Sequence, residues 1–504
     1  MKSLAQTLRP NRQDLPFPRS RRRIPSANHG HALKGRQRID PSRDAQGRFS
    51  WKARLFPILF FEIYLLASVL AFAFGPVDFP VRSPWILYGY VAFAQIIIFV
   101  GYYAGALRRP CGYSGKLPIK SVLALATIVT LLLLPPTIHF RNYAELSLVD
   151  ALTDPGAAYA ARVRELANRE SVSTISLLRG LFGPFLALLV PVGIVYSNRM
   201  TRTWRLLWQI AVLGIIIEPL LAGAAKGLFD LVLIIPWLIW VRMNIASSQH
   251  NLRPANLDQP IASSQQSLQT ANPTQSMVTG HTHRRTSLTL MQQFALGLVT
   301  VSIVCTGILY FTHSRQSRYG LAGNEYPPWT TGWAEPNYGV KLPASIEYTV
   351  YTITRYWSQG YFGLSECLDL PFELCYGCGH SQVWMRYVGR WMSDPDFFWN
   401  RCYPVRLEYA TGYEVAYYWH TIYPWLASDL TFPGAILFMG LMAFLFARAW
   451  SDTLLGQNPF AAGFVAQILL LFYYIPANNI RLMYSEEALT FWGLLAIWLI
   501  TRKR

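Results

Sequence analysis

Several charged side chains of this chain stand at the ends of long apolar segments, where a bilayer makes an unpaired charge costly. Lys226 lies in LAGAAKGLFD (221–230), between two apolar runs. The glycines and alanines leave the backbone open to a ligand, and the first turn of the following helix attracts anions. Arginine binds phosphate oxygens in pairs, and lysine adds a point charge. We therefore predict an anion-binding site formed by four cationic residues: Lys226, Arg179, Arg481 and Arg355.

A histidine and two carboxylates belong to the same level of the predicted membrane protein. His420 and Asp429 lie in HTIYPWLASDL, just before an apolar run, and Glu486 follows Arg481 in the last polar turn. Each residue also has a plainer explanation. His420 can pack in an aromatic cluster and Asp429 can cap a helix. Arg481 can form a surface ion pair, and Arg179 and Lys226 can reach up to lipid headgroups. The sequence leaves both explanations open.

The composition is typical of a polytopic membrane protein. Only 14% of the 504 residues are charged and 52% are hydrophobic, whereas a soluble domain carries roughly 25% charged residues. The net charge of +18 is concentrated in residues 1–54, which hold 14 Lys or Arg and 3 acids. This tail lacks apolar periodicity, so we interpret it as a disordered, basic, cytoplasmic segment at the lipid surface. We expect neither nucleic-acid binding nor a cleaved signal peptide.

Ten apolar runs are long enough to cross a bilayer as helices. With the amino terminus inside, the cytoplasmic segments carry 29 Lys or Arg and 5 acids, and the outer segments carry 15 and 19. This asymmetry predicts an all-α integral membrane protein with both termini in the cytoplasm. The predicted spans are 55–75, 84–106, 121–138, 174–196, 204–222, 228–245, 290–311, 432–450, 460–477 and 484–501.

The polar stretches divide the predicted bundle. A six-helix half (55–245) is followed by a flexible cytoplasmic linker (246–289) rich in Ser, Gln and Asn. The seventh helix (290–311) leads into a large periplasmic loop (312–431) with short helices, and three helices complete the chain within 432–504. Within the loop we expect an interfacial or re-entrant helix over 344–364. The alternative is an eleventh span there, which the polar residues Glu347, Arg355 and Gln359 disfavour.

The predicted periplasmic loop contains four of the six cysteines. In an oxidising compartment four cysteines suggest two disulfides, for which three pairings exist. A zinc site is the competing explanation, but the loop has one C-x-x-C and lacks a second pair at the usual spacing. We expect no metal and no cofactor. The disulfide candidates are Cys367, Cys375, Cys378 and Cys402.

The same loop is rich in aromatic residues, as in RYWSQGYFG and YYWHTIYPW. Aromatic side chains gather at membrane surfaces as an interfacial belt. Their flat faces also stack on sugars, while Arg, Asp and Asn bind hydroxyl groups. The aromatic content alone does not separate these two explanations.

Three segments resemble the bacterial O-antigen or oligosaccharide repeat-unit polymerases, which are multi-pass glycosyltransferases of the inner membrane. AGAAKGLFDLVLIIPWLIW resembles the family's small-residue, basic turn before a span. YTITRYWSQGYFGLSECL is similar to the aromatic-glycine segment that opens the large loop. HTIYPWLASDLTFPGAILFMGLMAFLFARAWSD is similar to the segment where that loop re-enters the membrane. It departs from the family in having LTFPG after Asp429, and this leaves the role of that residue open.

The resemblance implies a polyprenyl-diphosphate-linked oligosaccharide as substrate, polymerised at the periplasmic face without a bound metal. Lys226, Arg179 and Arg481 would hold the leaving diphosphate, on which charge grows as the glycosidic bond breaks. His420 would be the general base, with Glu486 or Asp429 as the alternatives. Partners would be membrane lipids and, in the same pathway, a chain-length regulator and a flippase.

Three other functions stay open. The chain can be an O-antigen ligase, which shares the general plan. It can be a transporter or flippase of lipid-linked glycans, although such proteins need charges through the depth of the bundle, where only Glu62 and Asp230 stand out. It can also be a non-catalytic scaffold of an export complex.

Overall fold

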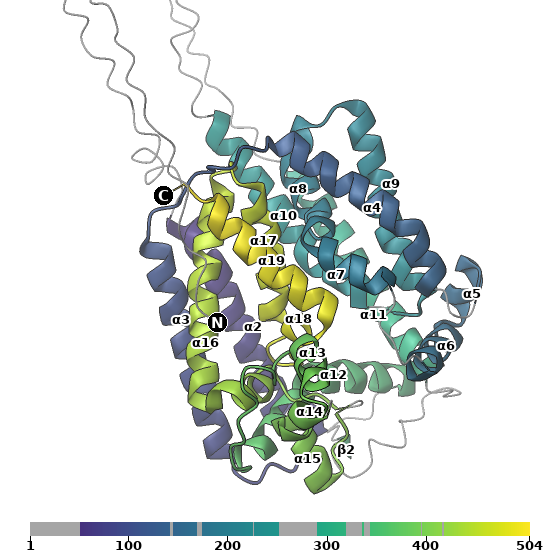
Figure 1. The fold of residues 1–504 in the computed structure, drawn as a ribbon, viewed down its shortest axis with the longest axis vertical. Helices are drawn as coiled ribbons and strands as arrows, with labels where there is room; N and C mark the ends of the chain where they lie inside the picture. Colours follow the sequence, from purple (N-terminus) through teal and green to yellow (C-terminus); the bar gives the residue numbers. More distant parts are fainter. Residues whose placement is uncertain are drawn as a thin grey trace, which may run out of the picture. The chain divides into compact units, whose positions relative to one another are not determined.

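A computed structural model describes nine stretches of the chain. They are residues 51–141, 145–168, 174–224, 226–250, 290–318, 335–336, 343–394, 396–415 and 418–503. Most of the predicted basic tail and cytoplasmic linker, and part of the predicted periplasmic loop, lie outside them. Most described residues are helical, and among them a single antiparallel pair joins β1 (Val77–Asp78) to β2 (Glu335–Pro336). The all-α prediction is confirmed for the described residues (Figure 1).

The helices follow the apolar runs of the sequence. Their bounds are α2 (Trp51–Phe74), α3 (Pro84–Leu107), α4 (Ile119–Arg141), α5 (Leu148–Thr153), α6 (Pro155–Asn168), α7 (Thr174–Leu186), α8 (Leu189–Tyr196), α9 (Arg202–Leu221), α10 (Lys226–His250), α11 (Leu290–Arg318), α12 (Ala344–Leu368), α13 (Gln382–Trp391), α14 (Phe397–Arg401), α15 (Tyr403–Thr411), α16 (Tyr423–Leu454), α17 (Pro459–Tyr473), α18 (Ile480–Met483) and α19 (Ser485–Thr501).

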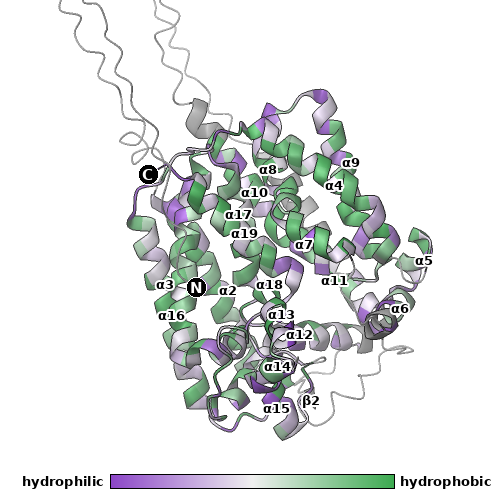
Figure 2. Cartoon of the chain, viewed as in Figure 1, coloured by the Kyte–Doolittle hydropathy of each residue, from purple (hydrophilic) through white to green (hydrophobic). Residues whose placement is uncertain are grey.

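Seven helical segments in the described residues are long and apolar enough to cross a membrane. They are α2, α3, α4, α9, α10, α16 and the consecutive α7 and α8 taken together over Thr174–Arg199. Figure 2 shows the hydrophobic residues concentrated on these helices. The chain is therefore a helical, multi-pass membrane protein. The three remaining predicted spans coincide with α11, α17 and α19, of which α17 has 15 residues and α19 has 17. A full crossing takes about 20 residues, so ten spans stay a prediction.

Glycines bring α3 and α16 into close contact. A Cβ atom built at Gly101 would lie 2.2 Å from the carbonyl oxygen of Gly440, and one at Gly105 would lie 2.5 Å from that of Phe444. Only glycine allows this approach of two backbones. Small residues four apart are a common device for packing helices in lipid, where apolar side chains gain little by leaving the bilayer. This contact fixes α16, and with it the segment at the start of that helix.

A break in α16 separates its first two turns from the rest of the helix. Thr431 has φ 65° and ψ 165°, and Pro433 follows two residues later. A β-branched residue adopts a positive φ rarely and at some energetic cost. The predicted eighth span begins directly after the break, whereas the helix itself begins eight residues earlier at Tyr423. The segment before the break carries Asp429.

One helix, α12, covers the segment predicted to be interfacial or re-entrant. It runs across the direction of α3 and α16 (Figure 1). Two of its glycines permit close packing: a Cβ atom at Gly360 would lie 2.1 Å from the carbonyl oxygen of Pro476, and one at Gly363 would lie 2.7 Å from that of Trp419. The aromatic-glycine segment of the sequence is therefore a packing surface for the loops before α16 and α18. Its position relative to a membrane stays a prediction.

Candidate functional site

Charged residues of three helices meet at the start of α10. Lys226 is the first residue of α10, and its Nζ lies 3.1 Å from Oδ2 of Asp230, one helical turn further on. The same Nζ lies 3.4 Å from Oε1 of Glu487 at the start of α19. Arg481 of the short helix α18 forms an ion pair with Asp230. Asp230 is therefore shared between two cations.

Asp230 and Arg481 form the buried centre of this group. The side chain of Arg481 is 7% exposed and that of Asp230 is 13% exposed, compared with 35% for Lys226. The hydroxyl of Tyr474 donates a hydrogen bond of 2.5 Å to Asp230, and Arg481 donates one of 3.4 Å to Gln467. Burial alone would lower the pKa of Arg481, but the carboxylates of Asp230 and Glu487 outweigh it and raise that pKa.

A second group adjoins the first through the consecutive glutamates of α19. Arg179 of α7 donates a hydrogen bond of 3.0 Å to Glu486, lies 3.9 Å from Glu218 of α9, and donates one of 3.3 Å to Thr137 of α4. Gly183 allows α7 to approach α19, because a Cβ atom there would lie 2.1 Å from the hydroxyl of Thr490. We call both groups together the charge cluster: Lys226, Asp230, Arg481, Glu487, Arg179, Glu218 and Glu486.

The structure thus brings together three of the four predicted anion-binding cations. It also brings four carboxylates to them, which changes the expected electrostatics. Among the described residues of the charge cluster the carboxylates outnumber the cations by one if all are ionised. An incoming anion must therefore compete with carboxylates that already occupy the cations. The most exposed of these ion pairs, Lys226 with Glu487, is the one that an anion can displace at the smallest cost, because solvent already screens it.

The small residues around Lys226 have a different role from the predicted one. Gly223 ends α9 with φ 59°, and a Cβ atom there would lie 2.5 Å from the carbonyl oxygen of Pro155 and 2.8 Å from the amide nitrogen of Tyr159. A Cβ atom built at Gly227 would lie 3.2 Å from the Cβ atom of Pro219. These two glycines accommodate neighbouring backbone and side chains. Packing therefore accounts for these two glycines, and access of a ligand to the backbone stays a prediction.

Asp429 holds a loop that carries a second histidine. Its carboxylate accepts hydrogen bonds from the backbone amides of Gly379 and His380, both of 2.9 Å, and lies 2.7 Å from Nδ1 of His380. A Cβ atom at Gly379 would lie 2.9 Å from that of Ser428. These bonds account for Asp429 as a residue that positions the loop, and the predicted helix cap is not needed. A carboxylate on Nδ1 orients the ring and leaves Nε2 for proton transfer.

His380 was absent from the residues selected by sequence. The stretch CYGCGH presents it beside two cysteines, in a loop with no apolar periodicity, and Asp429 is 49 positions away. No local signal joins the two residues. The loop is also tied to the charge cluster, because Nδ2 of Asn479 donates a hydrogen bond of 2.9 Å to the carbonyl oxygen of His380. Asn479 lies two positions before Arg481.

His420, the predicted general base, is fully buried. Neither ring nitrogen makes a hydrogen bond of normal geometry in the described residues, and the ring lies edge-on to Tyr413 at 5.0 Å. Burial lowers the pKa of His420 to about 3, with a weak opposing effect from the backbone of Tyr418. Since a general base must reach the substrate proton, this environment favours the plainer explanation of a packed aromatic-cluster histidine.

Arg355, the fourth predicted cation, belongs to the surroundings of His420. It lies on α12 with its guanidinium carbon 5.4 Å from the ring centre of Tyr418. In the described part of the chain it forms no ion pair with the charge cluster. Arg355 and His420 therefore make no ion pair or hydrogen bond with the charge cluster in the described residues, whereas the loop of His380 is joined through Asn479 to the segment that carries Arg481.

Three of the four loop cysteines share one apolar cluster. The sulfur atoms of Cys375 and Cys402 lie 3.9 Å apart, and Cys378 belongs to the same cluster. Cys367 is fully buried in the main core. All six cysteines are free thiols in this structure, and burial raises the pKa of the Cys378 thiol to about 11. Of the possible pairings the geometry favours Cys375 with Cys402. Among the described residues no group of three His, Cys, Asp or Glu side chains could hold a metal ion.

A comparison with known protein families, curated proteins and solved structures finds no match to this chain. The account of its function therefore rests on the chain's own residues and on their arrangement.

Proposed function

We propose that this chain is a glycosyltransferase that polymerises oligosaccharide repeat units carried on a polyprenyl diphosphate. The observation that carries the proposal is the charge cluster beside the His380–Asp429 pair, linked by the Asn479 hydrogen bond. One half offers cations to a leaving diphosphate, and the other offers a carboxylate-oriented imidazole to an attacking hydroxyl.

In this proposal the chain spans a bacterial inner membrane ten times with both termini in the cytoplasm. Helices α12 to α15 then belong to the periplasmic loop, and the charge cluster lies at the outer ends of α7, α9, α10 and α19. The charge asymmetry of the polar segments supports this orientation. Both lipid-linked substrates would reach the site from the outer leaflet.

The acceptor hydroxyl would attack the anomeric carbon of the growing chain, and the bond from that carbon to the diphosphate oxygen would break. His380 would take the hydroxyl proton at Nε2, with Asp429 holding the ring. The diphosphate would displace Glu487 from Lys226. The side chain of Glu487 is 27% exposed and that of Lys226 is 35% exposed. The buried pair of Arg481 and Asp230 would stay in place and support the site.

A second candidate is a transporter of the same lipid-linked glycans. It is supported by the pairing of every cluster cation with a carboxylate, since paired charges among spans are typical of ion-coupled transport. An O-antigen ligase would use the same groups as a polymerase and differs in its acceptor.

The test is the glycan length in a strain that lacks the protein and is complemented with variants at matched membrane levels. We expect single repeat units in the deletion strain and a ladder with the wild-type protein. Lys226→Ala and His380→Ala should abolish the ladder. Arg390→Gln, at an exposed position of α13, should preserve it. Full-length polymer stalled on its carrier would indicate a ligase. Units confined to the cytoplasmic face would indicate a transporter.

A further inference from the structure

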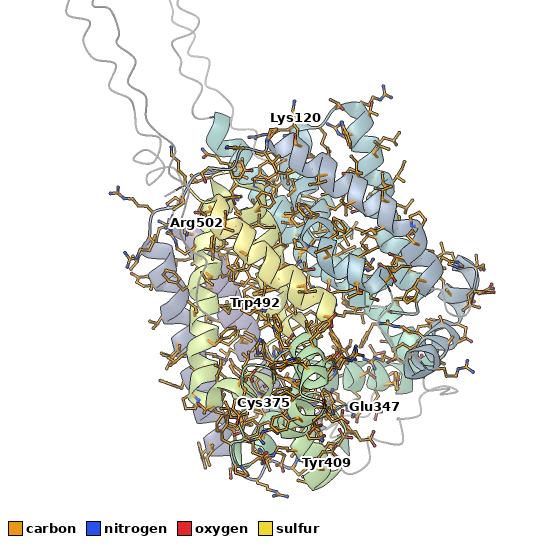
Figure 3. All side chains as sticks on the ribbon, viewed as in Figure 1. Lys120, Glu347, Cys375, Tyr409, Trp492 and Arg502 are labelled. Atoms are coloured by element: carbon orange, nitrogen blue, oxygen red, sulfur yellow. The ribbon has the colours of Figure 1, made fainter. Side chains whose placement is uncertain are left out.

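A cluster of arginines lies at the other end of α16 from Asp429. Arg448 is 19 residues beyond Asp429, which corresponds to roughly 28 Å along a helix. Arg448 shares the sulfur of Cys111 as a hydrogen-bond acceptor with Arg502, which follows α19, and the charge of Arg54 in the first turn of α2 also acts on it. Figure 3 shows Arg502 far from Cys375, toward the end of the view where Lys120 lies. We call Arg54, Arg448 and Arg502 the arginine cluster.

Arg448 is a buried cation that has no carboxylate of its own. It is 8% exposed, and no Asp or Glu oxygen lies within ion-pair distance of it in the described residues. Its Nη2 donates only to the sulfur of Cys111 at 3.5 Å, and its Nη1 is buried with no hydrogen-bond partner among the described residues. An unpaired buried charge is costly. A counter-charge at this place would remove most of that cost.

The nearby carboxylate of Asp452 already has three hydrogen-bond donors, none of them from Arg448. It accepts hydrogen bonds from the backbone amide of Cys111 at 2.7 Å, from the indole of Trp498 at 3.1 Å and from Arg502 at 2.8 Å. Its side chain is 0% exposed. Asp452 therefore neutralises Arg502, and it leaves Arg448 with only a distant attraction.

Arg54 adds a second positive charge that is directed to backbone oxygens. It donates to the carbonyl oxygens of Ala106 and Arg108, at the end of α3, and its Nε is buried without a partner in the described residues. The charges of Arg54 and Arg502 both act on Arg448. Of the three guanidinium groups only that of Arg502 is paired with a carboxylate, and the buried N–H groups of Arg54 Nε and Arg448 Nη1 lack acceptors among the described residues. This arrangement fits an anion with several oxygens, such as a phosphate group.

The surface beside the arginine cluster is apolar. Phe99, Tyr103 and Leu107 recur every four residues on α3 and are 38%, 41% and 54% exposed. Trp51, 42% exposed, packs edge-on against Tyr103 and lies beneath Arg54. An apolar stripe that ends at an interfacial tryptophan and an arginine suits an acyl chain below a headgroup.

We propose that the arginine cluster binds the phosphate of an anionic phospholipid, whose acyl chain lies along the exposed face of α3. The site is independent of the proposed glycosyl transfer. It ties together the ends of α2, α3, α16 and α19, because one phosphate would accept hydrogen bonds from residues of different helices.

The experiment measures the thermal unfolding midpoint of the full chain in nanodiscs of phosphatidylcholine, with and without phosphatidylglycerol. We expect phosphatidylglycerol to raise the midpoint of the wild-type protein and of Arg205→Gln, an exposed arginine of α9. The rise should be lost in Arg448→Gln and Arg448→Met. Removing a charged hydrogen-bond donor costs at least about tenfold in affinity, so lipid titrations should shift by that factor.

Two further measurements test the assignment of the ligand and of Arg448. Arg448→Met should be more stable than the wild-type protein in pure phosphatidylcholine, because an apolar side chain removes an uncompensated buried charge. Inorganic phosphate should not reproduce the effect of the lipid; if it does, a soluble phosphate is the ligand and the lipid assignment is wrong. An equal rise in Arg448→Met and wild-type protein would overturn the site. Equal retention of phosphatidylcholine and phosphatidylglycerol by the wild-type protein in native mass spectrometry would also overturn the site.

Discussion

Replacing Asp230 with asparagine isolates the centre of the charge cluster. The substitution keeps the size of the side chain and removes the charge that Arg481 and Lys226 share. It leaves Arg481 buried with a 3.4 Å hydrogen bond to Gln467 and the charge of Glu487 beyond ion-pair distance. We expect a large loss of stability, since the buried guanidinium then has no ion-pair partner among the described residues.

The size of the loss follows from the exposure of each partner. Removing one member of a buried ion pair costs about 3–5 kcal/mol, because the other charge is left without compensation. The pair with Lys226 adds roughly 0–1 kcal/mol, since that side chain is 35% exposed and screened by solvent. Asparagine still accepts one hydrogen bond from Tyr474. We therefore expect Asp230→Asn to lower the free energy of unfolding by about 3 kcal/mol.

The assay is unfolding by sodium dodecyl sulfate in mixed micelles, followed by tryptophan fluorescence. Arg481→Gln and the double variant complete a mutant cycle, and a coupling free energy of about 2 kcal/mol or more is expected for a buried pair. Glu487→Gln is the matched control. It touches the partly exposed Lys226 and should cost less than about 1 kcal/mol.

Two outcomes would refute this reasoning. If Asp230→Asn and Glu487→Gln cost the same, burial does not control the energetics of the cluster. If the loss of unfolding free energy in the double variant equals the sum of the losses in the two single variants, Asp230 and Arg481 are not coupled. The ion pair is then not the centre of the site.

Three further predictions concern other parts of the fold. Cys375 and Cys402 should be found as a disulfide when the protein is isolated without reductant and digested for mass spectrometry; free thiols at both positions would contradict the pairing. Because burial lowers the pKa of His420 to about 3, below the value of about 6.5 in the unfolded chain, the unfolded state binds the proton more readily below pH 6.5. Acidification to pH 5.5 should therefore lower stability by about 1.4 kcal/mol through this residue, and His420→Phe should remove that part of the pH dependence. Gly101→Leu should lower the free energy of unfolding by about 1–3 kcal/mol, because the new side chain meets the backbone of Gly440; an unchanged midpoint would show that α3 and α16 can separate without cost.

The sequence predicted most of the helices because apolar composition and length determine a membrane-crossing helix locally. The seven long apolar helices coincide with seven predicted spans. The start of α16 differs, since the segment Tyr423–Leu430 is also helical and is separated from the predicted span by the strained Thr431. Hydropathy does not report a break of this kind inside a helix.

The candidate site was predictable where charge at the end of an apolar run was the signal. Lys226 and Arg481 meet at Asp230, and Arg179 adjoins them through the consecutive glutamates of α19. The partners were not predictable. Asp230 attracted notice only as a carboxylate within a span, and His380 gave no signal, because its contact with Asp429 joins segments that are far apart in sequence. Residue type suggested His420 as the base, whereas packing buries it completely.

The central claim is that this chain transfers glycans between lipid diphosphates at the charge cluster. Its most direct test uses the purified protein in nanodiscs with a defined polyprenyl-diphosphate oligosaccharide and follows product length and released polyprenyl diphosphate together. The account predicts that one carrier diphosphate is released for each repeat unit added, and that His380→Ala and Lys226→Ala stop both while Arg390→Gln leaves both unchanged. If the wild-type protein releases no carrier and forms no longer product, while the substrate crosses the bilayer in its presence, the chain is a transporter and the account is wrong.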